Sequence, residues 1–520
     1  MRIRFFATLL AAGMLAPLAA IAQRPASPRF DLVETTIPTV RAALRSGSVS
    51  CHAVVQGYLD RIAAYDKTGP AINALIVVNP RALVLADSLD RYAEAGGKLG
   101  ALHCIPMIVK DNFQTTDLPT TAGSLSLQGF VPTNDAFMVQ RIRAAGAIVL
   151  AKSNMAEFAF TPYETVSSIL PGYTKNPYAL DRVTAGSSGG TAAAVAANLG
   201  EVGLGTDTGN SIRGPSSHQA LVGIRSTMGL TSRGGIAPLS LAADVAGPMA
   251  RTVADAATVL QVVAGEDPAD PVTVGANAHV ADYASALRRD ALRGARIGVL
   301  RQAYERPTTD TGIVRVFDAA LTDLRRQGAT VVDVTIPGLD AHLAAMTGGC
   351  NQFRHDLEQW LRSNGDRIPM HSLAEIIKSR RFHPTIQMRL EAAQADSMSP
   401  DSPGCRSRDG FRGWLRSATL AAMDSLHLDA LAYPTWSNPP RLIGDLNTPA
   451  GDNSQLFSPS TGYPAITVPM GFTLGDRLPA GLQLLGRPWS EATLIGLAYS
   501  YEQATHWRKA PASAPRLEMR

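Results

Sequence analysis

Lysine is the scarcest charged residue in this chain of 520 residues. Of the 48 basic residues, seven are lysines and 41 are arginines, and 44 acidic residues nearly balance them. The basic residues form no run, so the net charge of +4 offers no electrostatic surface for a nucleic-acid partner. Because a guanidinium is never deprotonated, a lysine on an apolar segment of such a chain indicates a role that arginine cannot fill.

Cysteines and metal-binding motifs are also scarce. The four cysteines are too few for a disulfide framework. Cys350 and Cys405 are a candidate bridge, whereas Cys104 lies on an apolar run and is expected to be a buried free thiol. No H-E-x-x-H or C-x-x-C pair occurs, which argues against a zinc hydrolase. No lysine follows a serine by three positions, which excludes an S-x-x-K site.

Apolar runs of membrane-spanning length are absent after the first 22 residues. Those residues begin with Met1-Arg2-Ile3-Arg4, continue as an apolar run interrupted by Pro17, and end in Ala20-Ile21-Ala22. This pattern is typical of a cleaved secretion signal. We therefore expect a mature chain of residues 23–520 that is periplasmic or secreted and has no integral membrane association. An uncleaved anchor is the alternative, which the short run and its proline disfavour.

Short apolar runs alternate with helical patterns along most of the chain. Because such alternation is typical of a sheet covered by helices, the sequence predicts an α/β fold with a large mixed, mostly parallel sheet and helices on both faces. The expected strands are Ile105–Val109, Ala147–Ala151, Val202–Gly205, Arg296–Leu300, Ala329–Val334, Ala430–Tyr433, Ala465–Pro469 and Gly481–Leu485. The expected helices include one capped by Ser50, Asp135–Ala145, Gly190–Asn198, Val314–Gln327 and one capped by Ser490.

The length alone would allow about three domains, but a large α/β sheet can absorb several hundred residues. We expect a single catalytic domain whose core is formed by about residues 45–265 and 425–508, with a variable inserted region at about 266–424. Within that region, Gly265–Val280 is rich in proline, aspartate and glycine and is interpreted as a linker. Residues 340–425 are polar and helical, which predicts a lid or cap.

Three segments indicate where the chemistry could lie. Ala185–Thr191 is a Gly/Ser cluster before an alanine-rich helix, and Gly205–Arg213 is a second small-residue turn directly after a strand. Such turns can aim backbone amides at a substrate carbonyl. Lys110 ends the apolar run that precedes both of them. Taken singly, a Gly/Ser cluster is typical of a turn or linker, and a lysine at a strand end is typical of a solvent contact.

Together, these segments resemble the motifs of the amidase-signature hydrolases. The run Cys104–Gly123 resembles the family's lysine motif, and Gly186–Gly190 and Gly205–Arg213 resemble its Gly/Ser signature. Further matches are Lys152–Met155, Gly247–Val253 and Pro479–Gln483. The resemblance covers about residues 45–265 and 425–508.

The resemblance implies a Ser–Ser–Lys triad. Ser211 would be the nucleophile, Ser187 the bridging serine on a cis peptide bond, and Lys110 the general base. A lysine acts as a base only when it is neutral, so its pKa must fall from about 10.4 towards 7–8 through desolvation and a neighbouring positive field. No metal or cofactor is required. The implied activity is hydrolysis of small-molecule carboxylic amides, with some esterase activity, by a monomer or homodimer.

The resemblance also implies an oxyanion hole made of backbone N–H groups. These groups would belong to Thr208, Gly209, Asn210 and Ser211. Asn210 departs from the family, which usually has glycine there; asparagine is the most tolerant substitute if the backbone is left-handed, and its side chain could narrow the acyl pocket or add a hydrogen bond. Asp207 and Arg213 are expected to hold the turn in shape.

A second departure is Gly223–Thr227, where the family commonly has a Lys-Pro pair. We interpret it as a variation in a turn without catalytic meaning.

Three other functions compete with this hypothesis. Gly186-x-Ser188-x-Gly190 fits the nucleophile elbow of α/β-hydrolases, with Ser188 attacking and His427 or His506 as base. The chain could also be a non-catalytic binding protein on the same fold, although all three triad positions are filled. A role in tRNA-linked amidation is disfavoured by the export signal, because charged tRNA is cytosolic. The sequence leaves the amide open: peptide amide, fatty amide, aryl anilide or cyclic amide.

Overall fold

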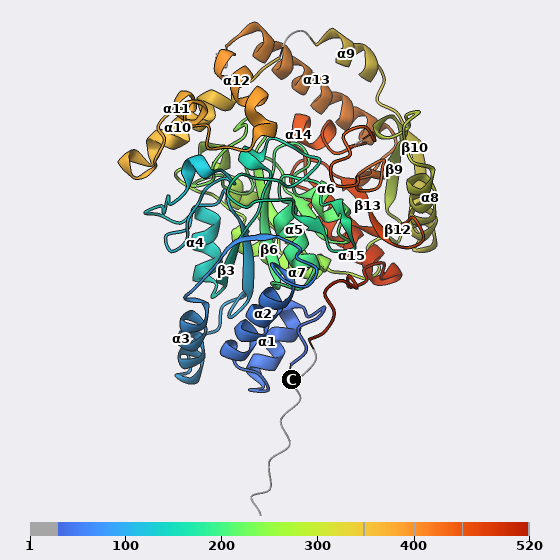
Figure 1. The fold of residues 1–520 in the computed structure, drawn as a ribbon. Coiled ribbons are helices and arrows are strands. Elements are labelled where there is room, and N and C mark those ends of the chain that lie inside the picture. Colours follow the sequence, from blue (N-terminus) through green and yellow to red (C-terminus); the bar gives the residue numbers. More distant parts are fainter. Residues whose placement is uncertain (1–29, 347–348, 397, 399–400, 450, 518–520) are drawn as a thin grey trace, which may run out of the picture.

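The centre of the molecule is one mixed sheet of eleven strands with helices packed on both faces (Figure 1). The computed structural model describes residues 30–346, 349–396, 398, 401–449 and 451–517, so the expected signal sequence, residues 1–22, lies outside the described residues. The spatial strand order is β1-β3-β2-β6-β8-β7-β12-β13-β11-β9-β10, and β4 and β5 form a separate pair. The strands are β1 Leu75–Val78, β2 Pro106–Lys110, β3 Ile148–Ser153, β4 Lys175–Asn176, β5 Ala179–Val183, β6 Val202–Asp207, β7 Val222–Arg225, β8 Val245–Ala250, β9 Arg296–Leu300, β10 Thr330–Val334, β11 Ala430–Pro434, β12 Ala465–Thr473 and β13 Leu478–Leu485.

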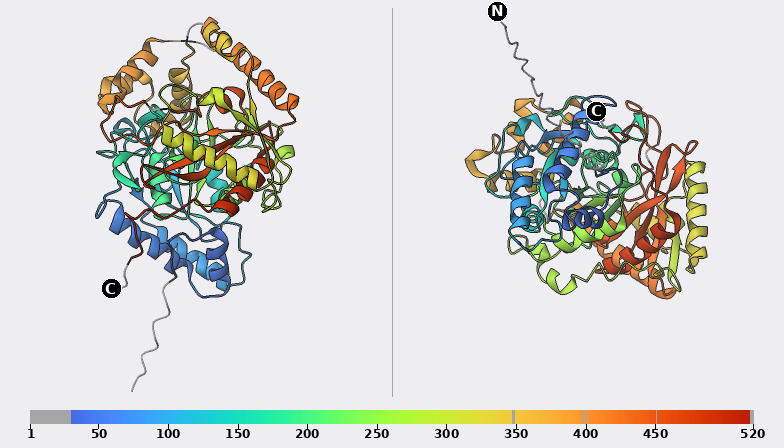
Figure 2. Two further views of the ribbon diagram at one scale, coloured as in Figure 1. Left: turned by 90° about the vertical axis from the view of Figure 1, so that its right-hand side faces the viewer. Right: turned by 90° about the horizontal axis from the view of Figure 1, so that it is seen from below.

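Helices form the outer layers and a separate group at one end of the molecule. They are α1 Ile37–Arg45, α2 Cys51–Tyr65, α3 Ala82–Glu94, α4 Phe137–Ala144, α5 Gly189–Ala196, α6 Arg213–Ser217, α7 Val253–Val263, α8 Thr311–Arg326, α9 Leu339–Ala345, α10 Phe353–Ser363, α11 Leu373–Ser379, α12 Gln387–Ala395, α13 Pro403–Ser425, α14 Phe457–Thr461 and α15 Glu491–Thr505. Figure 2 shows α8 lying along the β9–β10 side of the sheet. Every strand that the sequence predicts is present, within a few residues of its expected ends.

Parallel pairing is concentrated in two groups of strands. β3, β2 and β6 run parallel at one side of the sheet, and β11, β9 and β10 run parallel at the other. Antiparallel pairs join the strands between these groups; β12 and β13 are connected by a short turn, and β7 and β8 are strands that the sequence did not predict. The predicted large mixed sheet is thus confirmed, with four parallel pairs in the two groups and six antiparallel pairs elsewhere in this sheet among the described strands.

Helix α5 explains how the Gly/Ser segment is positioned. All eight of its residues are buried, and its alanines let the helix lie close to the sheet. A Cβ added at Gly203 on β6 would lie 2.4 Å from the side chain of Thr191 and 3.2 Å from that of Val195. Only glycine therefore permits this approach of helix to strand.

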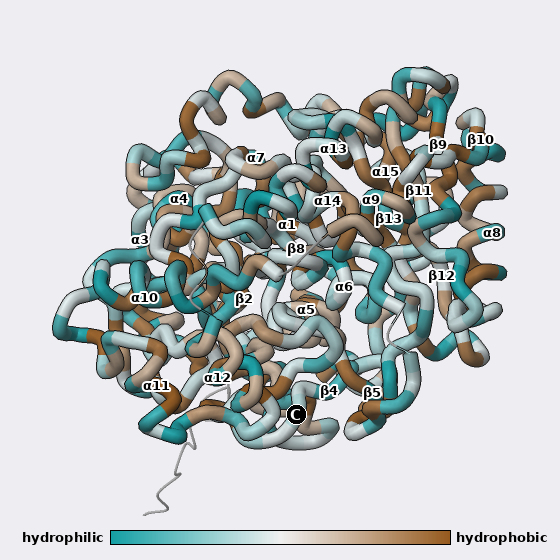
Figure 3. The backbone as a smooth tube through the Cα atoms, turned by 90° about the horizontal axis from the view of Figure 1, so that it is seen from above, coloured by the Kyte–Doolittle hydropathy of each residue, from teal (hydrophilic) through white to brown (hydrophobic). Residues whose placement is uncertain are grey.

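Residues 339–425 form a helical layer above the sheet, as their polar helical pattern predicted. The expected insertion at about 266–424 is too long, because β9 and β10 lie within it and belong to the central sheet, where β9 pairs with β11. Helices α9 to α13 lie together at the top of Figure 1, and Figure 3 shows long hydrophilic stretches along α10 to α12. Their apolar side chains form a second core with Phe130, Phe158 and Phe160 of the main body. Phe353 of α10 packs with its ring centroid 4.5 Å from that of Phe160. The layer is thus anchored on an aromatic cluster near the segment that contacts Ser187.

Two local interpretations of the sequence are wrong. Gly265–Val280 is not a free linker: Asp267 accepts a hydrogen bond from Ser232, and Asp270 forms an ion pair with Arg233. Ser490 precedes the last helix, but its hydroxyl donates to the carbonyl of Arg487 instead of capping the helix. Ser50, by contrast, accepts from the amide of Ala53 at 3.1 Å and caps α2 as predicted.

All four cysteines form disulfides, so the prediction that Cys104 is a free thiol is wrong. Cys51 pairs with Cys104, and Cys350 pairs with Cys405 as proposed from the sequence. The first bridge ties the start of α2 to the segment that enters β2. The second ties α13 to the chain before α10. Cys104 and its partner Cys51 are both buried. The apolar run around Cys104 does not reveal that a second cysteine is buried beside it.

Peptide mapping without reductant should recover one peptide pair linked through Cys51 and Cys104 and another through Cys350 and Cys405. Replacing Cys51 and Cys104 together by alanine should lower the free energy of unfolding by about 2–4 kcal/mol, because the unfolded chain regains the freedom of a loop. Recovery of Cys104 as an alkylated free thiol in the native protein would contradict this pairing.

Candidate active site

Lys110 is buried, and in the described part of the chain the hydrogen-bond partners of its amine are both hydroxyl groups. It is the last residue of β2, whose five residues are all buried. Its Nζ lies 2.7 Å from Oγ of Ser187 and 2.7 Å from Oγ1 of Thr206, within hydrogen-bond distance of both. In the part of the chain that the structure describes, no carboxylate forms an ion pair with it. A lysine in such a place has little to stabilise its charged form.

Burial lowers the pKa of Lys110 to about 7, while the nearby carboxylates of Asp244 and Asp207 act in the opposite direction. The low pKa agrees with the expectation for a base. The expected neighbouring positive field is wrong, because the charges that act on Lys110 are carboxylates. Desolvation is thus the cause that leaves a large fraction of the amine neutral near pH 7.

Lys152 provides the contrast within the same sheet. It is also fully buried, and burial lowers its pKa to about 8. However, its Nζ lies 3.5 Å from the carboxylate of Asp111 and donates to the carbonyls of Phe113 and Pro119. The contacts of Lys152 hold the loop that follows Lys110 in place, whereas the amine of Lys110 contacts the hydroxyl group of Ser187.

Ser187 is held rigidly beside Lys110. The Gly186–Ser187 peptide bond is cis, as expected. A Cβ at Gly186 would lie 2.4 Å from the carbonyl oxygen of Glu164, so only glycine fits before the bond. The carbonyl of Ser187 accepts from the amide of Ala156 at 3.1 Å. Phe158, two residues further on, belongs to the aromatic cluster beneath α10, so the inserted helices adjoin this segment.

Ser211 lies on the neighbouring turn, after β6. Its carbonyl accepts from the amide of Ser188 at 3.3 Å, which joins the two small-residue turns. Its hydroxyl donates to Oδ1 of Asn210 at 3.4 Å. Among the described residues no hydrogen bond links Ser211 to Ser187. The structure thus joins Lys110 to Ser187 directly and brings Ser211 to the adjacent turn without the last contact of the predicted triad.

The turn before Ser211 has free backbone donors. Within the described chain, the amides of Thr208, Gly209, Asn210 and Ser211 donate to no protein acceptor. The amides of Ile212 and Arg213, by contrast, both donate to the carboxylate of Asp207. Preorganised N–H groups of this kind can stabilise an oxyanion.

Asp207 is the anchor of this turn. Burial by itself would raise its pKa, but Arg213 and Arg225 outweigh burial and hold the pKa at about 2. Arg213 donates to Asp207 through Nε at 3.0 Å and to the carbonyl of Gly209 at 2.6 Å. The expected structural role of Asp207 and Arg213 is confirmed.

Arg225 was missed by the sequence analysis. Gly223–Thr227 is not a turn, because Val222–Arg225 forms strand β7. Arg225 is buried and donates to the carbonyl of Asp207 and, at 2.8 Å, to that of Ala243. The sequence feature that could have indicated Arg225 is a basic residue at the end of an apolar run.

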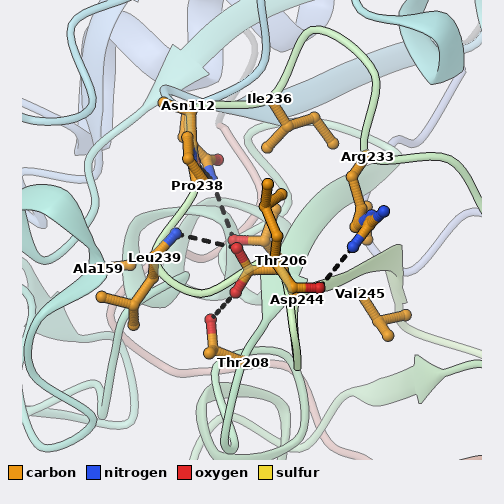
Figure 4. A pocket seen from close by; sticks show the side chains of 13 residues that line it. Asn112, Ala159, Thr206, Thr208, Arg233, Ile236, Pro238, Leu239, Asp244 and Val245 are labelled. Atoms are coloured by element: carbon orange, nitrogen blue, oxygen red, sulfur yellow. Dashed lines mark hydrogen bonds between the residues drawn. The ribbon is translucent and has the colours of Figure 1, made fainter. Parts of the chain in front are cut away.

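Thr206, Asn112 and Asp244 were also missed. Asn112 donates to Oγ1 of Thr206 at 3.1 Å (Figure 4). Thr208 donates to Asp244 at 2.5 Å, and burial raises the pKa of this carboxyl to about 6. These residues line a cavity of about 10 Å³, about the space that one water molecule needs. Asn112 follows Lys110 by two residues and Thr206 lies in the Gly/Ser motif, so the motifs could have indicated both.

Among the described residues the hydroxyl of Ser188 contacts no histidine or other base, so the nucleophile-elbow hypothesis is wrong. Its hydroxyl donates to the carbonyl of Thr206 at 3.1 Å and accepts from the amide of the same residue at 3.3 Å. His427 and His506 are exposed residues at the ends of α13 and α15. Ser188 therefore joins α5 to β6.

The described residues contain no group of three or more His, Cys, Asp or Glu side chains that could hold a metal ion. Nor does any helix in the described ranges have the length and apolar character to cross a membrane.

The family model described as "Amidase" matches residues 53–495. This chain belongs to the amidase family. The solved structure of a peptide amidase from Stenotrophomonas maltophilia superposes with a TM-score of 0.83 at 39% identity, covering 93% of this chain and 99% of that one.

Two curated relatives carry different names. One is the A subunit of glutamyl-tRNA(Gln) amidotransferase from Acinetobacter baumannii, which is 34% identical, with 93% of this chain and 98% of the relative covered. The other, a probable amidase from Arabidopsis thaliana, is 32% identical, with 97% and 96% covered.

Asn210 does not occupy its position for the sake of a left-handed backbone, because its φ is not positive. Its Oδ1 accepts the hydrogen bond of Ser211, and its Nδ2 has no partner among the described residues. A Cβ at Gly214 would lie 2.6 Å from Nδ2, so the carboxamide fills the space above the start of α6. The sequence suggested that the Asn210 side chain narrows the acyl pocket or adds a hydrogen bond, and the structure contains the hydrogen bond.

Asn210→Gly should leave the enzyme active and change its order of preference among acyl groups, because it removes side-chain volume next to Ser211 and keeps the backbone donor. Relative kcat/KM values across a panel of amides with different acyl groups measure this. An unchanged order of preference would show that Asn210 does not face the substrate.

Proposed function

We propose that this amidase is an exported hydrolase that cleaves carboxylic amides through an acyl-enzyme on Ser211. The observation that carries the proposal is the contact of buried Lys110, whose pKa burial lowers to about 7, with Ser187, next to a turn whose free amides precede Ser211. Lys152 could not take this role, because its amine contacts Asp111 and the carbonyls of Phe113 and Pro119 and donates to no serine among the described residues.

Each proton transfer in the proposed reaction has an assigned donor and acceptor. Lys110 accepts the proton of Ser187 as Ser187 accepts that of Ser211, and Oγ of Ser211 bonds to the carbonyl carbon of the amide. The turn amides stabilise the oxyanion. The proton returns through Ser187 to the departing amine as the C–N bond breaks. Water then attacks the acyl-enzyme by the same route and releases the acid. An ester would react by the same steps.

Peptide amides are the substrate class that we propose, because a relative named a peptide amidase is 39% identical over nearly its whole length. The relative named as part of an amidotransferase favours a second candidate, release of ammonia from glutamine for transfer. A panel containing peptide amides, aryl anilides, fatty amides and free glutamine separates the two: peptide amides should be turned over without any partner protein. Turnover of glutamine alone would favour the second candidate.

A fluorophosphonate probe should form a covalent adduct with Ser211, and Ser211→Ala should abolish both labelling and amide hydrolysis. Ser188→Ala is the matched control, because its hydroxyl bonds only to the main chain of Thr206. That variant should still be labelled at Ser211. An adduct that maps to Ser188 in the parent protein would contradict the assignment.

The value of kcat/KM should rise with pH through about 7 and level off above it, because the fraction of neutral Lys110 grows as the pH passes its pKa. Lys110→Arg should lower kcat/KM by about 10²–10⁴-fold at every pH, because a guanidinium stays protonated. His427→Ala and His506→Ala serve as controls and should change rates little. Near-normal turnover in Lys110→Arg would refute the lysine mechanism.

Export is supported by the signal-like first 22 residues and by two disulfides, which persist in oxidising compartments. We expect the native protein to begin at Gln23. Mass spectrometry of the amino-terminal peptide from the source organism tests this, and an intact Met1–Ala22 segment would contradict it.

A further inference from the structure

A cavity of about 200 Å³ lies on the side of α13 that faces α14, away from the proposed catalytic residues. Arg412 and Arg416, one helical turn apart on α13, both line it. Its other walls include Met228, Pro459 and Trp489. None of the described residues that line it is acidic. Two cations thus share one small space whose other walls are partly apolar and partly hydroxyl-bearing, the latter being Thr227, Ser460, Thr461 and Tyr463.

Arg412 is incompletely paired. Its side chain is 15% exposed, and its guanidinium donates to the carbonyl of Ala242 at 3.2 Å. The nearest carboxylate, that of Asp409, is 3.9 Å away and already bonds Arg408 at 2.9 Å. Burial lowers the pKa of Arg412 to about 10, and Arg408 and Arg416 add to this effect. A guanidinium carries five donors, so several remain for another acceptor.

Arg416 is unpaired in the part of the chain that the structure describes. Its guanidinium donates no hydrogen bond there and has no carboxylate within ion-pair distance. Like charges one helical turn apart repel each other unless an anion lies between them. An anion in the cavity would satisfy both guanidinium groups at once.

We propose that this cavity binds a small carboxylate with an apolar body, such as an aryl carboxylate. Planar guanidinium groups match the geometry of a carboxylate, and the proline, methionine and indole walls match an aromatic or branched body. The volume is too small for a peptide and suits a ring-sized ligand. The wall residue Ala242 belongs to the same loop as Asp244, which accepts the hydrogen bond of Thr208. The proposed site is therefore linked to the candidate oxyanion turn through one loop.

Titration of 4-fluorobenzoate, followed by ¹⁹F NMR, tests the proposal on the full-length mature protein. Binding should be saturable, and Arg412→Gln and Arg416→Gln should each weaken it by about tenfold through the loss of a charge-assisted hydrogen bond. Arg416 is exposed, so its replacement leaves the fold intact. Arg406→Gln is the matched control, since Arg406 lies on the same helix, is exposed and does not line the cavity. It should bind as the parent protein does.

Acetate and inorganic phosphate complete the design. Both should bind more weakly than 4-fluorobenzoate, because neither has a body for the apolar walls. The proposal is overturned by the absence of saturable binding, by unchanged affinity in Arg412→Gln or Arg416→Gln, or by an equal loss in Arg406→Gln. Phosphate binding as tight as that of 4-fluorobenzoate would overturn the assignment to carboxylates. Each of these outcomes is independent of whether the chain hydrolyses amides.

Discussion

The removal of Lys110 from water is the constraint on which the rest of the site depends. Lowering its pKa from about 10.4 to about 7 corresponds to roughly 5 kcal/mol of lost stabilisation of the charged form. The sheet lowers the pKa of Lys110 because all of β2 is buried and because the amine contacts two hydroxyl groups instead of a carboxylate. The cis bond at Gly186 and the close packing of α5 on β6 then place one of those hydroxyls.

The arginines around Asp207 perform the opposite task. Arg213 and Arg225 keep that carboxylate charged, and the carboxylate takes up the amides of Ile212 and Arg213. The amides immediately before them are left without protein acceptors. Asp207 thus forms ion pairs with Arg213 and Arg225 and shapes the turn, whereas the neighbouring Lys110 forms no ion pair among the described residues. The contrast between Lys110 and Lys152 shows the same division within a single sheet.

Much of the fold and of the candidate site could be predicted from local sequence patterns. The apolar runs predicted eight of the thirteen strands in the described residues, and the scarcity of lysine indicated Lys110. The motif resemblance predicted the cis bond. Two of the misses depend on contacts between distant parts of the chain. Cys51 lies 53 residues from Cys104, and Arg225 reaches Asp207 across 18 residues and a sheet.

Some misses have a different cause. β7 is only four residues long and was hidden by its glycine, so it looked like a turn. The sign of the electrostatic field at Lys110 also depends on Asp244, which follows it by more than a hundred residues. Neither spacing nor composition reports which charges a fold brings together.

The protonation state of Lys110 can be measured directly. The chain has only seven lysines, so selective ¹³C and ¹⁵N labelling of lysine gives a resolvable set of side-chain signals, and Lys110→Met identifies the signal of interest. A titration should give a pKa of about 7 for Lys110, separate from that of Lys152 at about 8. A pKa for Lys110 near the ordinary value of about 10.4 would contradict the account, because the lysine would then be charged at neutral pH and could not accept the proton of Ser187.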